Sequence, residues 1–561
     1  MAFIVKKKVY GNYYYYLRES KRQGKKVISK CLAYLGKNKE EAVKRAKEFL
    51  ENKEIKNSAE NNIKMEKEIV ENIPEKNEIS IEDIAVFCKK KGFVFPSSEI
   101  YGGFSGFWDF GPLGVELFNN LKSNWWKYFV QDNENMVGID ASIISNPRTW
   151  KASGHIESFS DISIQCKKCK KINKIDKVEI GKVKCEFCGG ELDKTTAKEL
   201  KLLFSTEVGA TDNRILSYLR GETAQGMFLD FKSVFDTSRV KLPFGIAQVG
   251  KCFRNEIAPR DFLFRSREFT IGEFEFFIHP DEFKCNLLDK QHLEVELRLL
   301  DAETQEKGDC SLKKTTIKKM LEEKRLDEWH AYWLAEQLLW FKSIGLLNKI
   351  KVREHKKSEL SHYSSATFDM DYEYPFGSKE VAGNANRGQY DLTQHIRESK
   401  QKLEIFDETT KQKIIPRVIE PTFGMERVFL AVLANAYNYD HKRGNVVLKL
   451  PNKLAPINLG IFSLVNKLNE QTKEQIYNLL RREFICQFDS SGSVGRRYAR
   501  ADEIGIPYCI TFDFESLKDK SVTIRERNTT KQVRVKISDL KNILKKLIDG
   551  EIEFEKSGKI I

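Results

Sequence analysis

The sequence predicts an α+β protein built on an antiparallel sheet with flanking helices. Three strand-like stretches, Phe244–Phe253, Phe262–Phe277 and Ala366–Tyr374, alternate with helix-like stretches such as Gly114–Val130 and Arg427–Tyr437. The regular crossovers of a doubly wound parallel sheet do not separate these strands, which favours antiparallel pairing. A chain of 561 residues has room for roughly three or four domains.

The composition is that of a soluble globular protein, with 41% hydrophobic and 31% charged residues. No apolar run approaches the ~18 residues of a membrane span. The apolar stretch before Lys6 is too short for a signal peptide, so we expect a cytoplasmic location.

The net charge of +14 suits a polyanionic partner such as nucleic acid, although a basic balance is also common in lysine-rich proteomes. Residues 1–50 contain 14 lysines and arginines but 4 acidic residues, a net of +10. Most of the excess therefore lies in a small part of the chain.

Residues 1–50 are predicted to form a basic, β-rich module. Val9–Leu17 and Val27–Leu35 are expected to be strands joined by a basic turn, Arg18–Lys26, and Lys39–Leu50 is expected to be a helix. The module resembles small β-rich DNA-binding units of transposase-like proteins, and its net charge of +10 favours a nucleic-acid contact over a plain soluble extension. Residues 51–80 have the composition of a charged linker.

Four of the 11 cysteines form two Cys-x2-Cys pairs, Cys166 with Cys169 and Cys185 with Cys188. Fifteen residues separate the pairs, a spacing typical of a structural Zn2+ site in which four thiolates close the coordination shell. We therefore expect a zinc-binding insertion over residues 161–200. Nearby lysines are compatible with an RNA contact or with a solvated surface.

A second group of residues clusters arginines on either side of one predicted turn. Phe253-Arg254-Asn255-Glu256 ends one strand, and Phe264-Arg265-Ser266-Arg267-Glu268-Phe269 leads into the next. Arginines from both strands can bind phosphate groups, while a glutamate and a phenylalanine can contact a purine. An exposed hairpin with ion pairs would have the same spacing.

A third group, Glu420-Pro421-Thr422-Phe423-Gly424-Met425-Glu426-Arg427, precedes a helix. Arg427 is expected in the first helical turn, from which its side chain can reach back over a ligand. An ordinary helix N-terminus with a favoured acidic residue is the other interpretation.

Taken in order, stretches of this chain resemble motifs 1, 2 and 3 of class II aminoacyl-tRNA synthetases, the second and third groups being motifs 2 and 3. The surrounding sequence is similar to the homodimeric glycyl-tRNA synthetase family, and this resemblance implies that Pro112, in the first motif, marks the dimer interface. The similar stretches include Ile100–Gly114, Ala152–His155, Arg220–Gly226, Leu242–Gly250, Arg353–His355, His362–Ser364 and Arg496–Asp502. The resemblance covers about residues 85–561. It implies a catalytic domain over 81–451 and an α/β anticodon-binding domain over 452–561. The charged, helix-like composition of residues 281–350 predicts a helical insertion there.

The resemblance also implies the reaction: glycine and ATP form glycyl-adenylate, and the glycyl group then passes to the 3′ end of tRNA(Gly). Arg254, Glu256 and Arg427 are the implied catalytic residues. The implied ATP-binding residues are Arg254, Asn255, Glu256, Phe264, Arg265, Ser266, Arg267, Glu268, Phe269, Glu380, Val381, Gly424, Met425, Glu426 and Arg427. Mg2+ is expected to accompany ATP.

The glycine pocket implied by the resemblance is small and acidic. Its residues are Glu222, Phe269, Glu273, Glu420, Thr422 and Gly424. Carboxylates suit an ammonium group, and sterics exclude larger amino acids, so no editing domain is required. Arg496, Arg497 and Arg500 are candidate RNA contacts in the C-terminal domain.

Two other functions are compatible with the fold. A non-catalytic descendant would bind nucleic acid without aminoacylating it, but such proteins usually lose the ATP-binding arginines or the pocket acids, and this chain keeps both. A class II synthetase for another small amino acid is disfavoured by the glycyl-like stretches.

Overall fold

The computed structural model describes residues 2–9, 12–23, 26–36, 41–42, 45–46, 79–158, 160–175, 180–181, 183–210, 212–360, 364–407 and 410–561. Its contacts divide the chain into two compact units, Met1–Ile79 and Ser80–Ile561. In these described ranges, no helix has the length and apolar character required to cross a membrane.

The first unit contains a three-stranded antiparallel sheet in the order β1-β2-β3. Its strands are β1 Ala2–Val9, β2 Asn12–Gln23 and β3 Lys26–Gly36. The predicted strand Val27–Leu35 is confirmed. The predicted basic turn Arg18–Lys26 is wrong over most of its length, because backbone pairing such as Lys21↔Ile28 keeps it extended through Gln23. Most of the predicted helix Lys39–Leu50 and of the predicted linker 51–80 lies outside the described residues.

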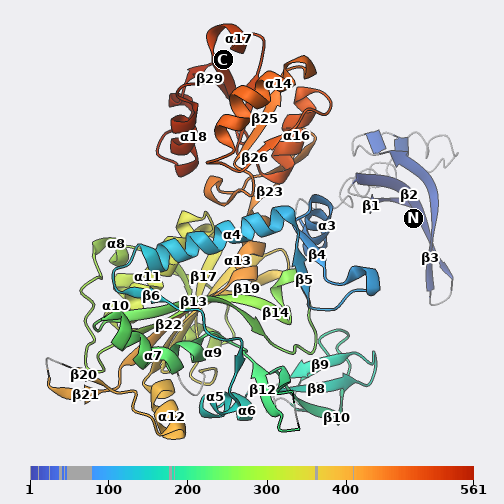
Figure 1. Ribbon diagram of the computed structural model, residues 1–561. Helices are drawn as coiled ribbons and strands as arrows, with labels where there is room; N and C mark the ends of the chain where they lie inside the picture. Colours follow the sequence, from blue (N-terminus) through green and yellow to red (C-terminus); the bar gives the residue numbers. More distant parts are fainter. Residues whose placement is uncertain are drawn as a thin grey trace. The chain divides into compact units, whose positions relative to one another are not determined.

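The second unit is built around a nine-stranded sheet in the order β16-β15-β17-β18-β19-β22-β14-β13-β6 (Figure 1). The strands are β6 Met136–Gly138, β13 Phe244–Phe253, β14 Glu268–Ile278, β15 Glu296–Leu300, β16 Lys313–Thr316, β17 Ile350–Glu354, β18 Ala366–Tyr374, β19 Gly377–Gly388 and β22 Arg417–Gly424. Neighbouring strands are antiparallel except for β6 with β13 and β15 with β17. The predicted antiparallel sheet is thus confirmed, and β13 and β18 have their predicted bounds.

The predicted strand Phe262–Phe277 divides into a short 3-10 helix, Phe262–Phe264, and β14. Asp261 and Phe262 have φ values of 58° and 57°, so the backbone turns sharply where an uninterrupted strand was expected.

Helices α4 Pro112–Trp126, α11 Glu328–Ser343 and α13 Met425–Ala436 pack on one face of this sheet (Figure 1). The ring of Phe274 on β14 lies 4.7 Å from that of Trp333 and 6.2 Å from that of Trp125. Successive strand residues point to opposite faces of a sheet. Because Phe274 packs in this aromatic layer, Glu273 and Glu275 point to the opposite face.

On that opposite face, helices α7 Ala224–Ser238 and α12 Tyr390–Ser399 cover one end. Their apolar side chains pack with Phe244, Phe277 and Val418 in one buried cluster. The remaining stretch of this face carries the polar residues described below.

Residues 281–350 were expected to be a helical insertion, and the structure differs from this expectation. The stretch supplies strands β15 and β16 to the main sheet as well as α8 Lys290–Leu293, α9 Ala302–Glu306, α10 Ile317–Glu322 and α11. Helix α11 is buried on nearly all sides, with Trp329, Trp333 and Trp340 all at most 1% exposed. It is therefore part of the core of the unit.

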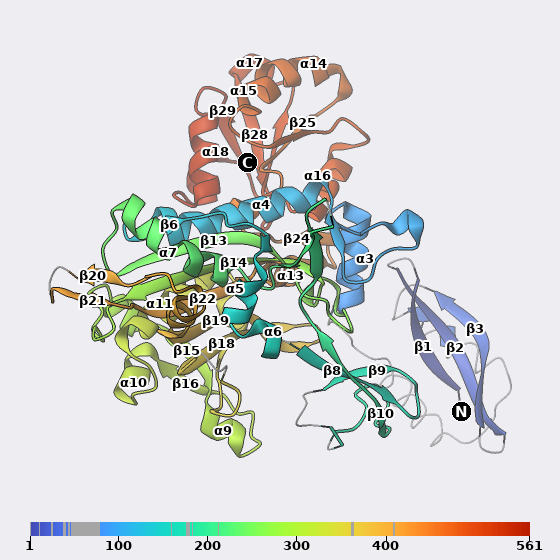
Figure 2. The same ribbon diagram turned by 60° about the horizontal axis from the view of Figure 1, so that its bottom comes forward.

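Shorter elements surround the main sheet. They are α3 Ile81–Lys91, β4 Val94–Pro96, β5 Trp108–Phe110, β7 Ile144–Ser145, α5 Pro147–Ala152, α6 His155–Ser158, β11 Ser205–Val208, β12 Ile215–Leu219, β20 Ile405–Asp407, β21 Gln412–Ile414, β23 Tyr437–Asp440 and β24 Asn445–Leu448. A separate three-stranded sheet contains β8 Ser160–Cys166, β9 Ile172–Ile175 and β10 Leu192–Lys201, side by side in Figure 2. It holds the four paired cysteines.

The C-terminal part forms a six-stranded sheet in the order β26-β25-β27-β28-β29-β30. Its strands are β25 Leu459–Ser463, β26 Cys486–Phe488, β27 Tyr508–Phe512, β28 Ser521–Glu526, β29 Gln532–Lys536 and β30 Lys559–Ile560, and its helices are α14 Asn469–Thr472, α15 Asn478–Leu480, α16 Val494–Ile504, α17 Ser516–Asp519 and α18 Leu540–Asp549. The sequence predicts a hairpin over Ser521–Arg527 and Gln532–Ile537 and a terminal helix over Leu540–Ile548, and β28, β29 and α18 confirm both. The glycine, serine and arginine content of Ser490–Arg500 predicts a loop. This prediction is wrong from Val494, where α16 begins and packs Ala501 against Phe462 and Cys509.

Candidate active site

The candidate site lies on the sheet face opposite the aromatic helices. Along β14, Phe269, Glu273 and Glu275 alternate toward this face. The register pairs Cys252 with Phe269 on one side, and Glu273 with Thr422 on the other. Residues from three strands that are distant in sequence are thereby brought to one surface.

Arg254 lies directly after β13 and turns toward β14. Its Nε donates a hydrogen bond to the carbonyl oxygen of Gly221 at 3.0 Å. Its guanidinium carbon lies 5.4 Å from the centre of the Phe269 ring. As predicted, the arginine that follows β13 therefore lies beside the aromatic residue of β14.

Glu256 and the two returning arginines form one hydrogen-bonded group. Arg265 Nε donates to Glu256 Oε2 at 2.7 Å. Arg267 Nε donates to the carbonyl oxygen of Glu256 at 3.1 Å, and its Nη1 donates to that of Ser105 at 2.9 Å. These bonds fix the turn between β13 and β14 and give this corner two cations beside one carboxylate.

Arg427 occupies the first turn of α13, as predicted, and reaches back to the turn between β13 and β14. Its guanidinium carbon lies 4.5 Å from the centre of the Phe264 ring, and its Nε donates to the Phe264 carbonyl oxygen at 3.3 Å. Its Nη1 lies 3.3 Å from Glu380 Oε2. Tyr374 holds the helix start by donating its hydroxyl to the Arg427 carbonyl oxygen at 2.8 Å.

Three predicted ATP-binding residues point to the other face of the sheet. Glu426 accepts hydrogen bonds from the Thr270 backbone nitrogen at 2.7 Å and hydroxyl at 2.9 Å. Glu268 lies 3.2 Å from Lys251 Nζ, and Met425 packs beside Gly272. Strand alternation explains this orientation. Glu268 and Thr270 face away from Phe269 because they lie one residue before and after it on β14, and Glu426 reaches the same face through its bonds to Thr270.

The remaining predicted ATP-binding residues differ in exposure. Ser266 and Val381 are buried, whereas Asn255 is exposed. The Ser266 hydroxyl donates to the Leu263 carbonyl oxygen at 3.4 Å, which is a local structural contact. Gly424 ends β22 opposite Ile271 and lies next to the Arg427 side chain.

The predicted acidic pocket is assembled beside the arginine cluster. Glu273 accepts hydrogen bonds from the hydroxyls of Thr223 at 2.5 Å and Thr422 at 2.8 Å. Glu420 accepts one from Arg387 Nη1 at 2.7 Å. Glu222 Oε2 lies 3.0 Å from His155 Nε2. The structure thus brings all three predicted pocket acids into one polar region.

The pKa values of the three pocket acids are shifted in different directions. Burial opposes ionisation of Glu222, but the adjacent His155 and Arg387 outweigh burial and hold its pKa well below the ordinary value. Burial and the charge of Glu222 raise the pKa of Glu273. Burial raises the pKa of Glu420 well above its ordinary value, against the opposing effect of Arg387. Glu222 therefore supplies a negative charge inside this largely buried pocket, which suits a small cation.

Several pocket residues are missing from the sequence-based prediction. Arg387 is 2% exposed and donates to Asp391 through both Nε and Nη2 at 2.8 Å, besides its bond to Glu420. Thr223 and His155 are also pocket residues, because they contact Glu273 and Glu222 respectively. Their stretches, Arg220–Gly226 and Ala152–His155, were singled out from the sequence, but neither residue was given a role. Arg387 lies in no recognised motif.

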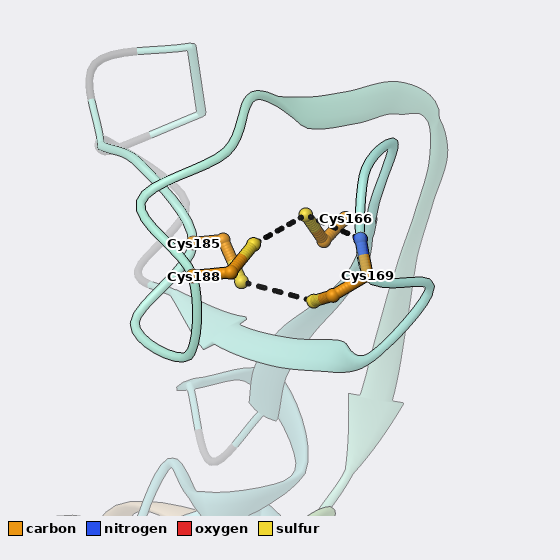
Figure 3. Close-up of side chains that lie close together, drawn as sticks. All are labelled: Cys166, Cys169, Cys185 and Cys188. Atoms are coloured by element: carbon orange, nitrogen blue, oxygen red, sulfur yellow. Dashed lines mark hydrogen bonds between the residues drawn. The ribbon is translucent and has the colours of Figure 1, made fainter. Parts of the chain in front are cut away.

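The four cysteines form a compact cluster (Figure 3). The Sγ atoms of Cys166 and Cys188 lie 3.6 Å apart, as do those of Cys169 and Cys185, and all four lie within 4.8 Å of one another. A tetrahedral Zn2+ with bonds of ~2.3 Å requires sulfur separations of about 3.8 Å. The donor set therefore fits Zn2+, and four protein ligands would leave no open coordination position.

The three candidate RNA-contacting arginines of the C-terminal domain differ in exposure. Arg497 is 2% exposed and donates to the carbonyl oxygens of Ser463, Ser490 and Gly492. This burial contradicts its prediction as an RNA contact. Arg500 is exposed and bonded to Asp489, and Arg496 is exposed.

Comparison with known proteins gives a family for both parts of the second unit. A family described as "Anticodon binding domain" matches residues 457–547. A glycine–tRNA ligase from Borrelia garinii subsp. bavariensis is 40% identical over 488 residues, covering 85% of this chain and 100% of the relative. A glycine–tRNA ligase from Ruminiclostridium cellulolyticum is 41% identical over 494 residues (82% and 97%), and one from Lachnoclostridium phytofermentans is 41% identical over 502 residues (84% and 99%).

Proposed function

The chain belongs to the glycine–tRNA ligase family, and on that premise we propose how its sheet-face site performs the reaction. The protein is an aminoacyl-tRNA ligase that activates glycine with ATP and transfers the glycyl group to tRNA(Gly). The observation that carries the assignment of the site is the adjacency of the arginine cluster and the acidic pocket along β14.

Arg254 is the residue proposed to bind the α-phosphate and stabilise the charge that develops on it. Preorganised donors in a partly desolvated site stabilise such charge more than water does. The ring of Phe269 lies against Arg254 and is proposed to stack on adenine. The Glu256 carboxylate would accept a hydrogen bond from the amino group of adenine. Mg2+ bound with ATP would neutralise phosphate charge, and no residue is assigned to hold it.

Arg265, Arg267 and Arg427 are proposed to bind the outer phosphates, and Arg427 also to cover the second face of adenine. Support comes from the contact of Arg427 with Phe264 and from the fixed orientation of Arg265 and Arg267 at Glu256. Reaction then depends mainly on positioning, since the glycine carboxylate attacks the α-phosphorus directly and pyrophosphate leaves.

Glu222, Glu273 and Glu420 are proposed to bind the glycine ammonium group, with Thr422 and Gly424 beside them. Ionised Glu222 supplies the fixed negative charge. The strands bring these residues close together, so a side chain on the amino acid would meet the packed sheet face.

Amino-acid-dependent exchange between ATP and pyrophosphate tests this proposal, with glycine, alanine and serine run side by side. Strong exchange with glycine alone is the expected result. Equal exchange with alanine or serine would indicate a synthetase for another small amino acid. Absence of exchange with all three, from folded and metal-loaded protein, would leave a nucleic-acid-binding protein without this activity.

A homodimer is proposed as the working form. Apolar residues are exposed along the small sheet β7-β12-β11: Ile144 is 46%, Ile215 60% and Leu216 53% exposed. A second copy of the chain would cover exposed apolar side chains of this kind. Light scattering should give twice the chain mass, and Ile215→Asp with Leu216→Asp should give monomers.

The N-terminal unit is proposed to contact nucleic acid, on the strength of its net charge of +10 over residues 1–50. Removing residues 1–79 should weaken tRNA binding and flatten its dependence on salt. An unchanged affinity and salt dependence would contradict the proposal. A cytoplasmic location is proposed as well, since none of the ten described cysteines forms a disulfide.

A further inference from the structure

Glu275 on β14 is a buried carboxyl group that the reaction described above does not use. Its exposure is 0%, and among the described residues neither of its oxygens has a hydrogen-bond partner. An oxygen of Glu275 lies within 4.8 Å of one from Glu273 and one from Glu420. The unpartnered group is therefore directed into the acidic pocket.

The strand register explains this position. Glu273 pairs with Thr422 and Phe276 with Ile419, which places Glu275 directly across from Glu420 in the antiparallel ladder. Side chains of directly opposed residues stand side by side, with Cβ atoms ~5 Å apart. Glu420 is thus the natural partner of Glu275.

The neighbouring acids already have donors, and Glu275 has none that the structure describes. Glu273 accepts from Thr223 and Thr422, and Glu420 accepts from Arg387. An ionised carboxylate without a donor is strongly disfavoured at full burial. Burial, with the added charge of Glu420, raises the pKa of Glu275 well above its ordinary value. Of the two facing carboxyl groups, Glu275, which lacks a donor, is therefore the one expected to hold a proton.

We propose that Glu275 is a positioning residue that donates a hydrogen bond through its carboxyl proton to Glu420, opposite the bond from Arg387. Glu420 is then fixed from two sides, with its carboxyl oxygens oriented toward the ammonium group of the amino acid. This inference rests on the proposed function, because it assigns Glu420 to amino acid binding. Glu275 itself touches neither glycine nor ATP.

Two substitutions test the hydrogen bond. Glu275→Gln keeps the shape and a neutral donor, whereas Glu275→Met keeps the length and removes the donor. With Glu275→Gln, we expect the KM for glycine to stay within about threefold of wild type. With Glu275→Met, we expect it to rise roughly tenfold or more, while the KM for ATP stays within about twofold. Glu373→Gln and Glu373→Met, at a half-exposed site of the same sheet, are the matched controls.

The infrared difference spectrum between wild type and Glu275→Gln gives a second readout that does not require the methionine variant to fold. It should contain the C=O band of a protonated carboxyl group at neutral pH. Absence of this band overturns the inference. Equal losses in Glu275→Gln and Glu275→Met also overturn it, since they would indicate that an ionised carboxylate is required.

Three acids this close together could instead hold a divalent cation. Titration with Mg2+ or Mn2+ in the absence of ATP, monitored by calorimetry, distinguishes this case. Binding to wild type that is lost in Glu275→Gln would replace the hydrogen bond by a metal site and overturn the inference. Failure of wild type to show glycine-dependent exchange would contradict the proposed function, a result independent of the band and of the cation titration.

Discussion

Arg387 Nη1 and Glu420 Oε1 lie 2.7 Å apart, and both side chains are less than a tenth exposed. The guanidinium is held on its other side by Asp391. One buried cation therefore orients an acid of the proposed glycine pocket and joins β19 and α12 to β22.

Arg387→Ala should strongly destabilise the second unit. Removing one partner of a buried ion pair leaves uncompensated charge and typically costs about 3–5 kcal/mol. Urea unfolding followed by circular dichroism measures the loss. Arg298→Ala, which breaks a more exposed pair with Glu373, is the control and should cost at most about 1 kcal/mol. Similar losses in both variants would contradict the role of Arg387.

Arg427→Ala should reduce activation without unfolding the protein. The side chain is 29% exposed, so stability should change little, but its proposed phosphate contact would be lost. Loss of a donor that stabilises transition-state charge typically lowers kcat by roughly 100-fold or more. Pyrophosphate exchange measures the rate, and a melting curve matching that of wild type excludes misfolding. Undiminished exchange would remove Arg427 from the proposed site.

Glu222 should contribute a pH-dependent part of the stability. Its pKa in the folded protein lies below the ordinary value of 4.5, so its ionised form stabilises the fold above that pH. The contribution is lost as the pH falls below 4.5 toward the folded-state pKa. The difference in unfolding free energy between wild type and Glu222→Gln should therefore shrink on acidification. A difference that stays constant between about pH 6 and pH 3 would contradict the stabilisation of ionised Glu222 by its neighbours.

Metal removal should affect the insertion around the four cysteines. Structural Zn2+ stabilises its small domain directly, so chelation or Cys185→Ser should open residues 161–200 to protease. Metal analysis should give one Zn2+ per chain in wild type, and limited proteolysis with mass spectrometry should locate the new cuts. Cys310→Ser, at an exposed cysteine outside the cluster, is the control. Full metal content in Cys185→Ser would contradict the four-cysteine site.

Arg497 and Arg496 should behave differently although they are adjacent. Arg497→Ala removes hydrogen bonds to three carbonyl oxygens and should destabilise the C-terminal domain by about 2–4 kcal/mol. Arg496→Ala should leave the melting temperature unchanged and, if this residue contacts RNA, weaken tRNA binding. Thermal melting and tRNA titration of both variants separate the two roles. An unaltered stability of Arg497→Ala would show that its buried bonds contribute little.

Patterns that are local in sequence carried much of the prediction. The two Cys-x2-Cys pairs, the Arg254 and Arg265 stretches and the start of a helix near Arg427 each lie within a few residues. Their chemistry follows from spacing along a strand, turn or helix. The antiparallel pairing of β13 with β14 could be expected for the same reason, since a short connection joins them.

The two faces of β14 were decided by the tertiary structure. Glu268 and Phe269 are neighbours in sequence, yet helices α4 and α11 cover the face of Glu268, and Phe269 faces the site. The sequence stretch indicates an important strand, but it does not say which side becomes the core. That choice depends on where the aromatic residues of distant helices pack.

The sequence by itself therefore determined the family, the antiparallel sheet and the chemical types of residue at the site. The tertiary structure decided which of these residues meet. Arg387 and Glu420 are 33 residues apart, and Thr223 and Glu273 are 50 apart. Strand register and helix packing bring such pairs within hydrogen-bond distance, and both depend on contacts that no local pattern encodes.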